Sequence, residues 1–257
     1  MMVYEICFSP TGGTKRVLDI LCGAWGGEAT TLDLLAGIPD GHAFTREDLC
    51  FVGVPVFGGR VPALAVKRLE ALTANGARAV PVAVYGARAF DDALLELTDT
   101  LTGLGFRCCA AIAALAEHSI FRVFGQGRPD QADQEILSGF ARTLRTLAEE
   151  NALPDTVSVP GHRPYTKPGG LPIHPAGGEG CVRCGKCAAA CPTGAITAPH
   201  FDQTDDKACI TCMRCVSVCP TGARHLDQAV LDKARVSMAK AFAGERHNQL
   251  FLDRSPS

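Results

Sequence analysis

Two stretches in the C-terminal third of the chain repeat one twelve-residue pattern. They read Cys181-Val-Arg-Cys184-Gly-Lys-Cys187-Ala-Ala-Ala-Cys191-Pro192 and Cys209-Ile-Thr-Cys212-Met-Arg-Cys215-Val-Ser-Val-Cys219-Pro220. In each stretch three cysteines stand three residues apart, and a fourth stands directly before a proline. Both stretches continue as Pro-Thr-Gly-Ala, which indicates a duplicated unit with a pseudo-two-fold axis. Thiolates at this spacing can wrap one face of a metal centre, so the pattern predicts two such centres.

The pattern resembles the ligand run of two-cluster bacterial ferredoxins, in which the cysteine before proline binds the cluster of the other repeat. Two structural zinc sites of four cysteines each are the alternative. They would need only paired C-x-x-C steps and would have no use for the crossed cysteine. The resemblance therefore implies two [4Fe–4S] clusters, one held by Cys181, Cys184, Cys187 and Cys219, the other by Cys209, Cys212, Cys215 and Cys191.

Composition limits the classes of partner. The chain has 257 residues and a formal net charge of −2, without a Lys/Arg block or a basic face with interleaved aromatics, so we expect neither nucleic acid nor membrane as a partner. Its start lacks a basic leader, and no apolar run approaches the roughly 20 residues of a membrane span, which predicts a cytoplasmic protein. The five cysteines outside the repeats are expected to be buried small hydrophobes: Cys7, Cys22, Cys50, Cys108 and Cys109.

Ahead of the repeats, short apolar segments alternate with segments of helical periodicity. Apolar strands that alternate with helices predict a parallel sheet covered on both faces, here a five-stranded doubly wound α/β sheet. The expected strands are 3–8, 29–34, 49–54, 79–85 and 108–115, and the expected helices are 14–24, 61–73, 91–104 and 129–151.

The pattern also predicts domain boundaries. We expect an α/β domain over residues 1–152 and a small α+β cluster domain over 179–226. Between them, residues 153–178 carry six prolines mixed with glycines, which is typical of a semi-rigid linker. Residues 227–257 should form a C-terminal helix and a tail containing Leu250-Phe251-Leu252. We expect the tail to brace one domain, and a partner-docking tail is the alternative.

Three loops should meet at the carboxyl edge of the sheet, where open parallel sheets bind ligands. The first strand leads into Ser9-Pro10-Thr11-Gly12-Gly13-Thr14 and a helix, the layout of a phosphate cradle. The third strand ends in a segment with Phe57, Gly58 and Gly59, and the fourth in one with Tyr85, Gly86 and Arg88. Glycines, an arginine and aromatics would suit a flavin ring, although each loop could equally be an ordinary turn with a core aromatic.

The first loop resembles the flavodoxin phosphate loop, Thr/Ser-x-Thr-Gly-x-Thr, which Ser9, Thr11, Gly12 and Thr14 match. With the cysteine runs, nearly the whole chain resembles the flavodoxin–ferredoxin fusion proteins found mainly in anaerobes. The only tryptophan, Trp25, ends the first helix, so the Trp/Tyr ring sandwich of many flavodoxins is not reproduced. The resemblance implies that Ser9, Thr11, Gly12, Gly13 and Thr14 bind an FMN phosphate, and that Phe57, Gly58, Gly59, Tyr85, Gly86 and Arg88 lie along the ring.

These features predict an electron-transfer protein that relays electrons between two [4Fe–4S] clusters and FMN, with a redox protein as donor or acceptor. No catalytic residue is expected, and a homodimer is compatible with the pattern. One alternative is a flavin-dependent reductase that uses the clusters as a wire, with His118 as a candidate proton donor. Another is a cluster-bearing interaction module without flavin.

Overall fold

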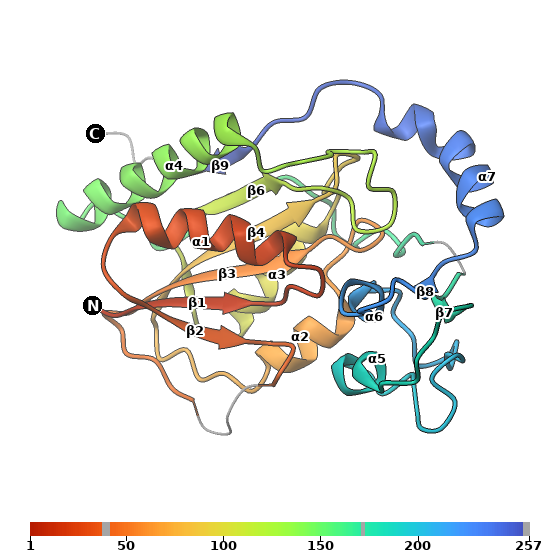
Figure 1. Ribbon diagram of the computed structural model, residues 1–257. Helices are drawn as coiled ribbons and strands as arrows, with labels where there is room; N and C mark the ends of the chain where they lie inside the picture. Colours follow the sequence, from red (N-terminus) through yellow and green to blue (C-terminus); the bar gives the residue numbers. More distant parts are fainter. Residues whose placement is uncertain (38–41, 171–172, 254–257) are drawn as a thin grey trace. The chain divides into compact units, whose positions relative to one another are not determined.

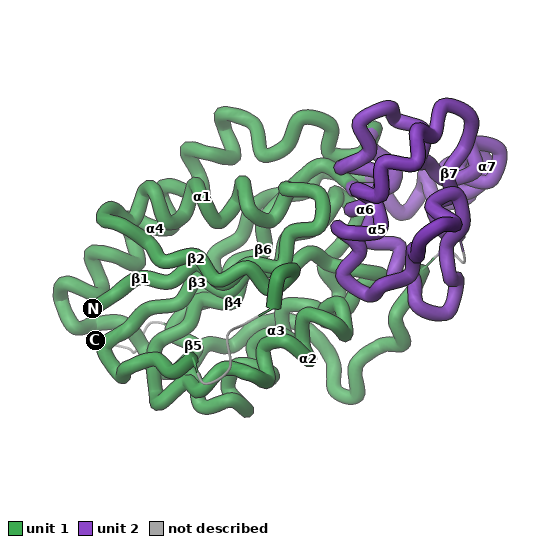
Figure 2. Tube along the Cα trace, turned by 60° about the horizontal axis from the view of Figure 1, so that its bottom comes forward, with its two compact units in different colours: residues 1–118, 123–170, 244–257 green, residues 119–122, 171–243 purple. Residues whose placement is uncertain are grey.

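The computed structural model describes residues 1–37, 42–170 and 173–253, which form two compact units (Figure 2). Unit 1 comprises residues 1–118, 123–170 and 244–257, and unit 2 comprises residues 119–122 and 171–243. The chain therefore leaves unit 1, builds unit 2 and then returns to unit 1. Residues 171–172 of the predicted linker and 254–257 of the predicted tail lie outside the described residues.

Unit 1 is built on one sheet with the order β2-β1-β3-β4-β6-β9 (Figure 1). The strands β2, β1, β3, β4 and β6 pair in parallel, and β1 stands between β2 and β3. This is the flavodoxin-like strand order, so the predicted five-stranded doubly wound sheet is confirmed. The strands are β1 (Val3–Cys7), β2 (Ala29–Asp33), β3 (Leu49–Pro55), β4 (Arg78–Tyr85), β5 (Arg107–Cys108), β6 (Ala111–Leu115) and β9 (Gln249–Phe251).

Helices cover both faces of the sheet. One face packs with α1 (Gly13–Trp25) and α4 (Gln131–Glu149), which lie side by side in Figure 1. Leu18 and Leu21 of α1 and Leu137 and Leu144 of α4 are fully buried there, as an amphipathic helix face requires. The other face packs with α3 (Ala93–Gly103), and α2 (Ala63–Leu69) lies beside α3. The five cysteines outside the repeats are all buried, as expected.

Two parts of the sheet differ from the sequence expectation. The predicted fifth strand is divided into β5 and β6, because β5 pairs with the start of β4 and β6 with its end. The tail adds β9, which pairs antiparallel with β6 and becomes an edge strand. Asn248 fixes this strand: its Oδ1 accepts from the N–H of Leu115 at 2.8 Å, and its Nδ2 donates to buried Asp133 at 2.6 Å.

The first part of the predicted linker is anchored to unit 1. We call residues 155–169 the strap. Its backbone and hydroxyl groups bond to Asp92, whose carboxylate accepts from the N–H of His162 at 2.9 Å and from the N–H and hydroxyl of Thr166 at 2.7 and 2.8 Å. Arg60 adds a bidentate ion pair with Glu96 and donates to the carbonyl of Thr166 at 2.8 Å. A proline-rich segment without periodicity is therefore held by side chains rather than by a sheet.

Unit 2 contains short elements around the cysteine repeats. The strands β7 (Ala176–Gly177) and β8 (Arg224–His225) pair antiparallel, and the helices α5 (Lys186–Ala190) and α6 (Arg214–Ser217) each follow one cysteine pair. The helix α7 (Gln228–Met238) and the 3₁₀ helix η1 (Ala239–Phe242) complete the unit. The predicted tail is thus divided, with its helix in unit 2 and its last strand in unit 1. Among the described residues, every helix is too short or too polar to cross a lipid bilayer.

Candidate functional site

The backbone of unit 2 repeats itself along the two cysteine stretches. Equivalent residues adopt the same left-handed conformation, which most side chains avoid. The φ angles are 52° and 50° for Arg183 and Thr211, 75° and 63° for Gly185 and Met213, and 68° and 66° for Gly194 and Gly222. Gly185 and Met213 are also the N-caps of α5 and α6. The sequence duplication is therefore a duplication of backbone geometry.

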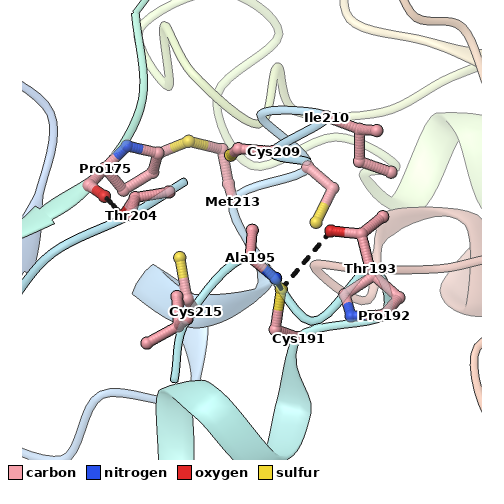
Figure 3. A pocket seen from close by; sticks show the side chains of 12 residues that line it. Pro175, Cys191, Pro192, Thr193, Ala195, Thr204, Cys209, Ile210, Met213 and Cys215 are labelled. Atoms are coloured by element: carbon pink, nitrogen blue, oxygen red, sulfur yellow. Dashed lines mark hydrogen bonds between the residues drawn. The ribbon is translucent and has the colours of Figure 1, made fainter. Parts of the chain in front are cut away.

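Two pockets collect the eight cysteines into groups of four. Cys191, Cys209, Cys212 and Cys215 line one pocket, and Figure 3 labels Cys191, Cys209 and Cys215 around it. Cys181, Cys184, Cys187 and Cys219 line the other. In each group the cysteine before proline comes from the opposite repeat, which is the grouping that crossed ligation predicts. Among the residues that the structure describes, no three His, Cys, Asp or Glu side chains are arranged to hold a single metal ion.

The two cysteines before proline sit in hydrogen-bonding turns. Burial raises the pKa of Cys191, but bonds from the hydroxyl and N–H of Thr193 and from the next N–H groups outweigh it, so the pKa lies below its usual value. One of these bonds joins the N–H of Ala195 to Cys191 Sγ at 3.3 Å. Burial also raises the pKa of Cys219. Hydrogen bonds from the N–H of Arg224 and from the N–H and hydroxyl of Thr221 outweigh it, so this pKa is lowered as well. Both turns therefore favour the thiolate, the form that binds metal.

Burial has the largest effect on the pKa of the remaining three cysteines of the first pocket. It raises the pKa of Cys209 and Cys215, and that of Cys212 to about 11. A buried thiolate needs positive charge or hydrogen-bond donors close by. Bound iron would supply the positive charge. The N–H of Thr211, 3.4 Å from Cys209 Sγ, is one of the hydrogen-bond donors. The donor set and its surroundings fit a [4Fe–4S] cluster in each pocket.

The predicted phosphate loop lies between β1 and α1, at the carboxyl edge of the sheet. Ser9 Oγ accepts from the N–H of Lys15 at 3.0 Å, which folds the loop back over the first turn of α1. Gly12 has a φ of 90° and precedes Gly13, the first residue of α1. Gly12, the N-cap residue, has no side chain to cap the helix. Ser9 Oγ takes the N–H of Lys15 instead, and the N–H groups at the start of α1 give the loop the layout of an anion site. Thr11 is exposed and Thr14 is buried.

The predicted ring glycines have neighbours within the protein. Phe57, which is half-buried, and Arg60 are joined by two backbone hydrogen bonds across the Gly58-Gly59 turn. A Cβ on Gly58 would lie 1.7 Å from the carbonyl oxygen of Gly169 in the strap. A Cβ on Gly59 would lie 2.3 Å from the Asp91 carboxylate, and one on Gly86 would lie 2.7 Å from His118 Cα. The close approach that these glycines permit is made by the strap and neighbouring loops, and their place along a ring stays a prediction.

Two further predicted ring residues also have partners within the protein. Tyr85 is 2% exposed, packs edge-on against Phe90, and donates its hydroxyl to the carbonyl of His247 at 3.0 Å. It is a core residue and has no free face for stacking. Arg88 is partly exposed but forms an ion pair with Asp91. Burial, followed by the charge of Arg88, lowers the pKa of His118 to about 4, so its imidazole is neutral near pH 7.

One candidate was missed at the sequence level. Arg224 is 2% exposed and lines the pocket of Cys181, Cys184, Cys187 and Cys219. Aligning the two repeats residue by residue would have found it, because Arg224 takes the place that Ile196 holds in the first repeat, two residues after Gly in Cys-Pro-Thr-Gly-Ala-x.

Comparison with known proteins bears on both units. Residues 173–224 match the family model of the 4Fe-4S dicluster domain. No curated protein matches the chain. Similar solved structures include flavodoxins from Streptococcus pneumoniae TIGR4 and Megasphaera elsdenii and one from the domain Archaea. Their identities are 15%, 12% and 10%, they cover 57%, 55% and 58% of this chain and 99% of their own, and their TM-scores are 0.39, 0.36 and 0.37.

The strand order of unit 1 and the family match in unit 2 define a flavodoxin-like α/β fold combined with a 4Fe-4S dicluster domain. The chain thus has the architecture of a flavodoxin–ferredoxin fusion, as the sequence resemblance implied. This architecture supports a role in electron transfer.

Proposed function

We propose that this chain relays electrons between two [4Fe–4S] clusters in unit 2 and an FMN bound to unit 1. The clusters exchange single electrons, whereas the flavin accepts or releases two, so the combination links one-electron and two-electron carriers. The chain's own residues bind, orient and tune these groups. The partner would be a redox protein that donates or accepts electrons, and two chains could act as a homodimer.

The observation that carries the proposal is the grouping of cysteines around two pockets. Residues far apart in sequence, such as Cys191 and Cys212, line the same pocket. Neighbours in one repeat, such as Cys187 and Cys191, line different ones. In the proposed function, the first pocket's four thiolates hold one cluster and the second pocket's four hold the other.

The proposal for FMN rests on the loop from Ser9 to Thr14. The left-handed Gly12 and the N-terminus of α1 would bring backbone N–H groups to the phosphate, with the Thr11 and Thr14 hydroxyls as further candidates. Phe57 and Arg88 are the predicted ring residues whose side chains are partly exposed. The ring is therefore proposed to lie near these two, and Gly58, Gly59 and Gly86 to shape the loops behind it.

Cofactor content tests the proposal directly. We expect about eight iron, eight acid-labile sulfide and one FMN per chain after anaerobic purification and reconstitution. Stoichiometric zinc without sulfide would refute the cluster assignment, and iron–sulfur protein without flavin would refute the relay.

Flavin retention tests the phosphate loop. A Cβ built on Gly13 would lie 3.5 Å from Ala116 Cβ. Gly13→Leu adds a branched side chain beyond that point and should release FMN. The joint change of Thr11 and Thr14 to Val should weaken retention by removing two hydroxyls. Gly23→Leu, on the exposed side of the same helix, is the control and should keep FMN. Iron content should be the same in all variants, and equal flavin retention would place the phosphate elsewhere.

A further inference from the structure

The two repeats differ in charge at one buried position. After the fourth cysteine, the first repeat reads Pro-Thr-Gly-Ala-Ile196 and the second reads Pro-Thr-Gly-Ala-Arg224. Both side chains are buried, with 4% of Ile196 and 2% of Arg224 exposed. Each lines the pocket that contains the fourth cysteine of its own repeat. An apolar residue is the expected occupant of such a position, because a buried cation is costly unless it is paired.

Backbone oxygens hold the Arg224 guanidinium in place. Nη1 donates to the carbonyl of Phe201 at 2.6 Å, and Nη2 donates to the carbonyls of Pro175 at 2.9 Å and Gln203 at 3.2 Å. Nη2 also bonds to the hydroxyl of Thr204. All these acceptors are neutral, and among the described residues no salt bridge to Arg224 is formed. The full positive charge is therefore fixed inside unit 2 without a carboxylate to neutralise it.

One donor of this guanidinium lacks an acceptor. Arg224 Nε is buried and has no hydrogen-bond partner within the described parts of the chain. Buried N–H groups without a partner in the protein are rare, and a bound ion or ligand is one of the ordinary reasons for them. The guanidinium also bonds to Pro175 and Thr204, which line the pocket of Cys191, Cys209, Cys212 and Cys215. Arg224 thus lines the pocket of Cys219 and holds two residues in the wall of the other pocket.

We propose that Arg224 is a fixed positive charge shared by the two clusters, which raises the reduction potential of both, with Nε donating a hydrogen bond to a cluster or cysteine sulfur. This inference rests on the proposed function, since it requires both clusters. A reduced cluster carries one more negative charge than an oxidised one, so a nearby buried cation stabilises the reduced form. Exposed charges between the ligands, such as Arg183, should act less because water and salt screen them.

A charge-matched pair of variants tests the potentials. Arg224→Gln and Arg224→Lys both lose hydrogen bonds to the carbonyls, but only Lys keeps the charge. In the cluster-loaded full chain, redox titration followed by electron paramagnetic resonance should show both potentials lowered in Arg224→Gln. We expect at least a tenfold change in each one-electron equilibrium, or 59 mV. Arg224→Lys should remain closer to wild type than Arg224→Gln at both clusters.

The repeats supply the matched control. Arg183→Thr copies Thr211, which has the same φ, and removes an exposed charge between two ligands. It should change either potential less than tenfold. Three results would each overturn the proposal: unchanged potentials in Arg224→Gln, equal shifts in Gln and Lys, or a shift confined to one cluster.

A second measurement avoids substitution of Arg224 altogether. Arg183→Thr combined with Arg214→Lys, each copied from the opposite repeat, leaves Arg224 as the only arginine between Cys181 and His225. With ¹⁵N-labelled arginine, the reduced protein should show a ¹⁵N coupling to a cluster spin. If eight iron per chain are present and no coupling is seen, the inference about Arg224 is refuted and the proposed function is not. Absence of iron and sulfide from the wild type would instead refute the proposed function and this inference with it.

Discussion

Met213 and Gly185 illustrate how residue-level geometry constrains the cysteine repeats. Both adopt left-handed backbone conformations, although only glycine does so without strain. Equivalent φ values at three pairs of positions indicate that the turns in and after the cysteine runs are fixed by the placement of the cysteine side chains, and not by the backbone preference of each residue. The cysteine before proline comes after α5 or α6 in the chain. It lines the pocket of the first three cysteines of the other repeat.

The crossed grouping leads to a prediction at the residue scale. Cys191→Ala combined with Cys212→Ala removes two residues from one pocket and should leave one intact [4Fe–4S] cluster. Cys191→Ala combined with Cys184→Ala removes one residue from each pocket and should damage both. Iron analysis and electron paramagnetic resonance of the two double variants distinguish these cases. If an intact cluster survived only in the Cys184/Cys191 pair, each repeat would close on its own cluster.

At the scale of elements, the strap shows how a segment without secondary structure is held. Asp92, at the start of α3, accepts the strap's hydrogen bonds while itself only 1% exposed. Val157 and Val159 pack against the core cluster that includes Tyr85 and Leu94. The turn at Gly58 accepts from the N–H of Gly169 at 2.8 Å. The strap therefore closes over α3 and ends at the carboxyl edge of the sheet.

The strap should be sensitive to acid. Hydrogen bonds from Thr166 lower the pKa of Asp92 to about 2, against burial, with further bonds from His162. Because the folded pKa is below the unfolded value of about 3.9, this contribution to stability is present above about pH 4 and is lost as the pH falls through about 2. Hydrogen exchange of the Thr166 amide should therefore accelerate over that interval.

Asp92→Asn should produce the same opening at neutral pH. Loss of buried charge-assisted bonds costs about 1–3 kcal/mol, or about a 5- to 150-fold faster exchange at Thr166. The comparison is Asp99→Asn. Asp99 binds two strap side chains, the 63% exposed Arg163 and the partly exposed Tyr165, and should matter less than buried Asp92. Unchanged exchange at Thr166 in Asp92→Asn would mean that Asp92 does not anchor the strap.

At the scale of the whole molecule, the two units depend on different forces. Unit 1 buries large side chains from its central strands, the residues that follow them and its helices, among them Phe51, Phe8 and Leu94. The buried set of unit 2 is smaller and includes Cys212 and Cys215, with Ile196 and Leu226 among its few large aliphatic residues. A small unit with so little apolar core usually needs metal to fold.

Removing the clusters should therefore unfold unit 2 selectively. After chelation under oxidising conditions, amides of residues 173–243 should lose protection from hydrogen exchange, while those of β1, β3 and β4 should keep it. Reconstitution with iron and sulfide should restore protection. Retention of protection in unit 2 without iron would show that its protein core is sufficient. Loss throughout the chain would show that the units unfold together.

The sequence by itself determined the local chemistry: the cysteine spacing, the glycine loop after the first strand and the alternation of apolar strands with helices. These patterns are periodic or local, so they predicted the parallel sheet, the cluster domain and the phosphate loop. Only the tertiary structure decided the contacts of residues whose partners are remote in sequence. Tyr85 bonds to His247, Gly58 admits Gly169, and β9 returns to pair with β6 across more than 130 residues. Long-range packing has no signature within a sequence window. The sequence shows that Arg224 replaces Ile196, but its burial and its hydrogen bonds beside the two pockets are known only from the fold.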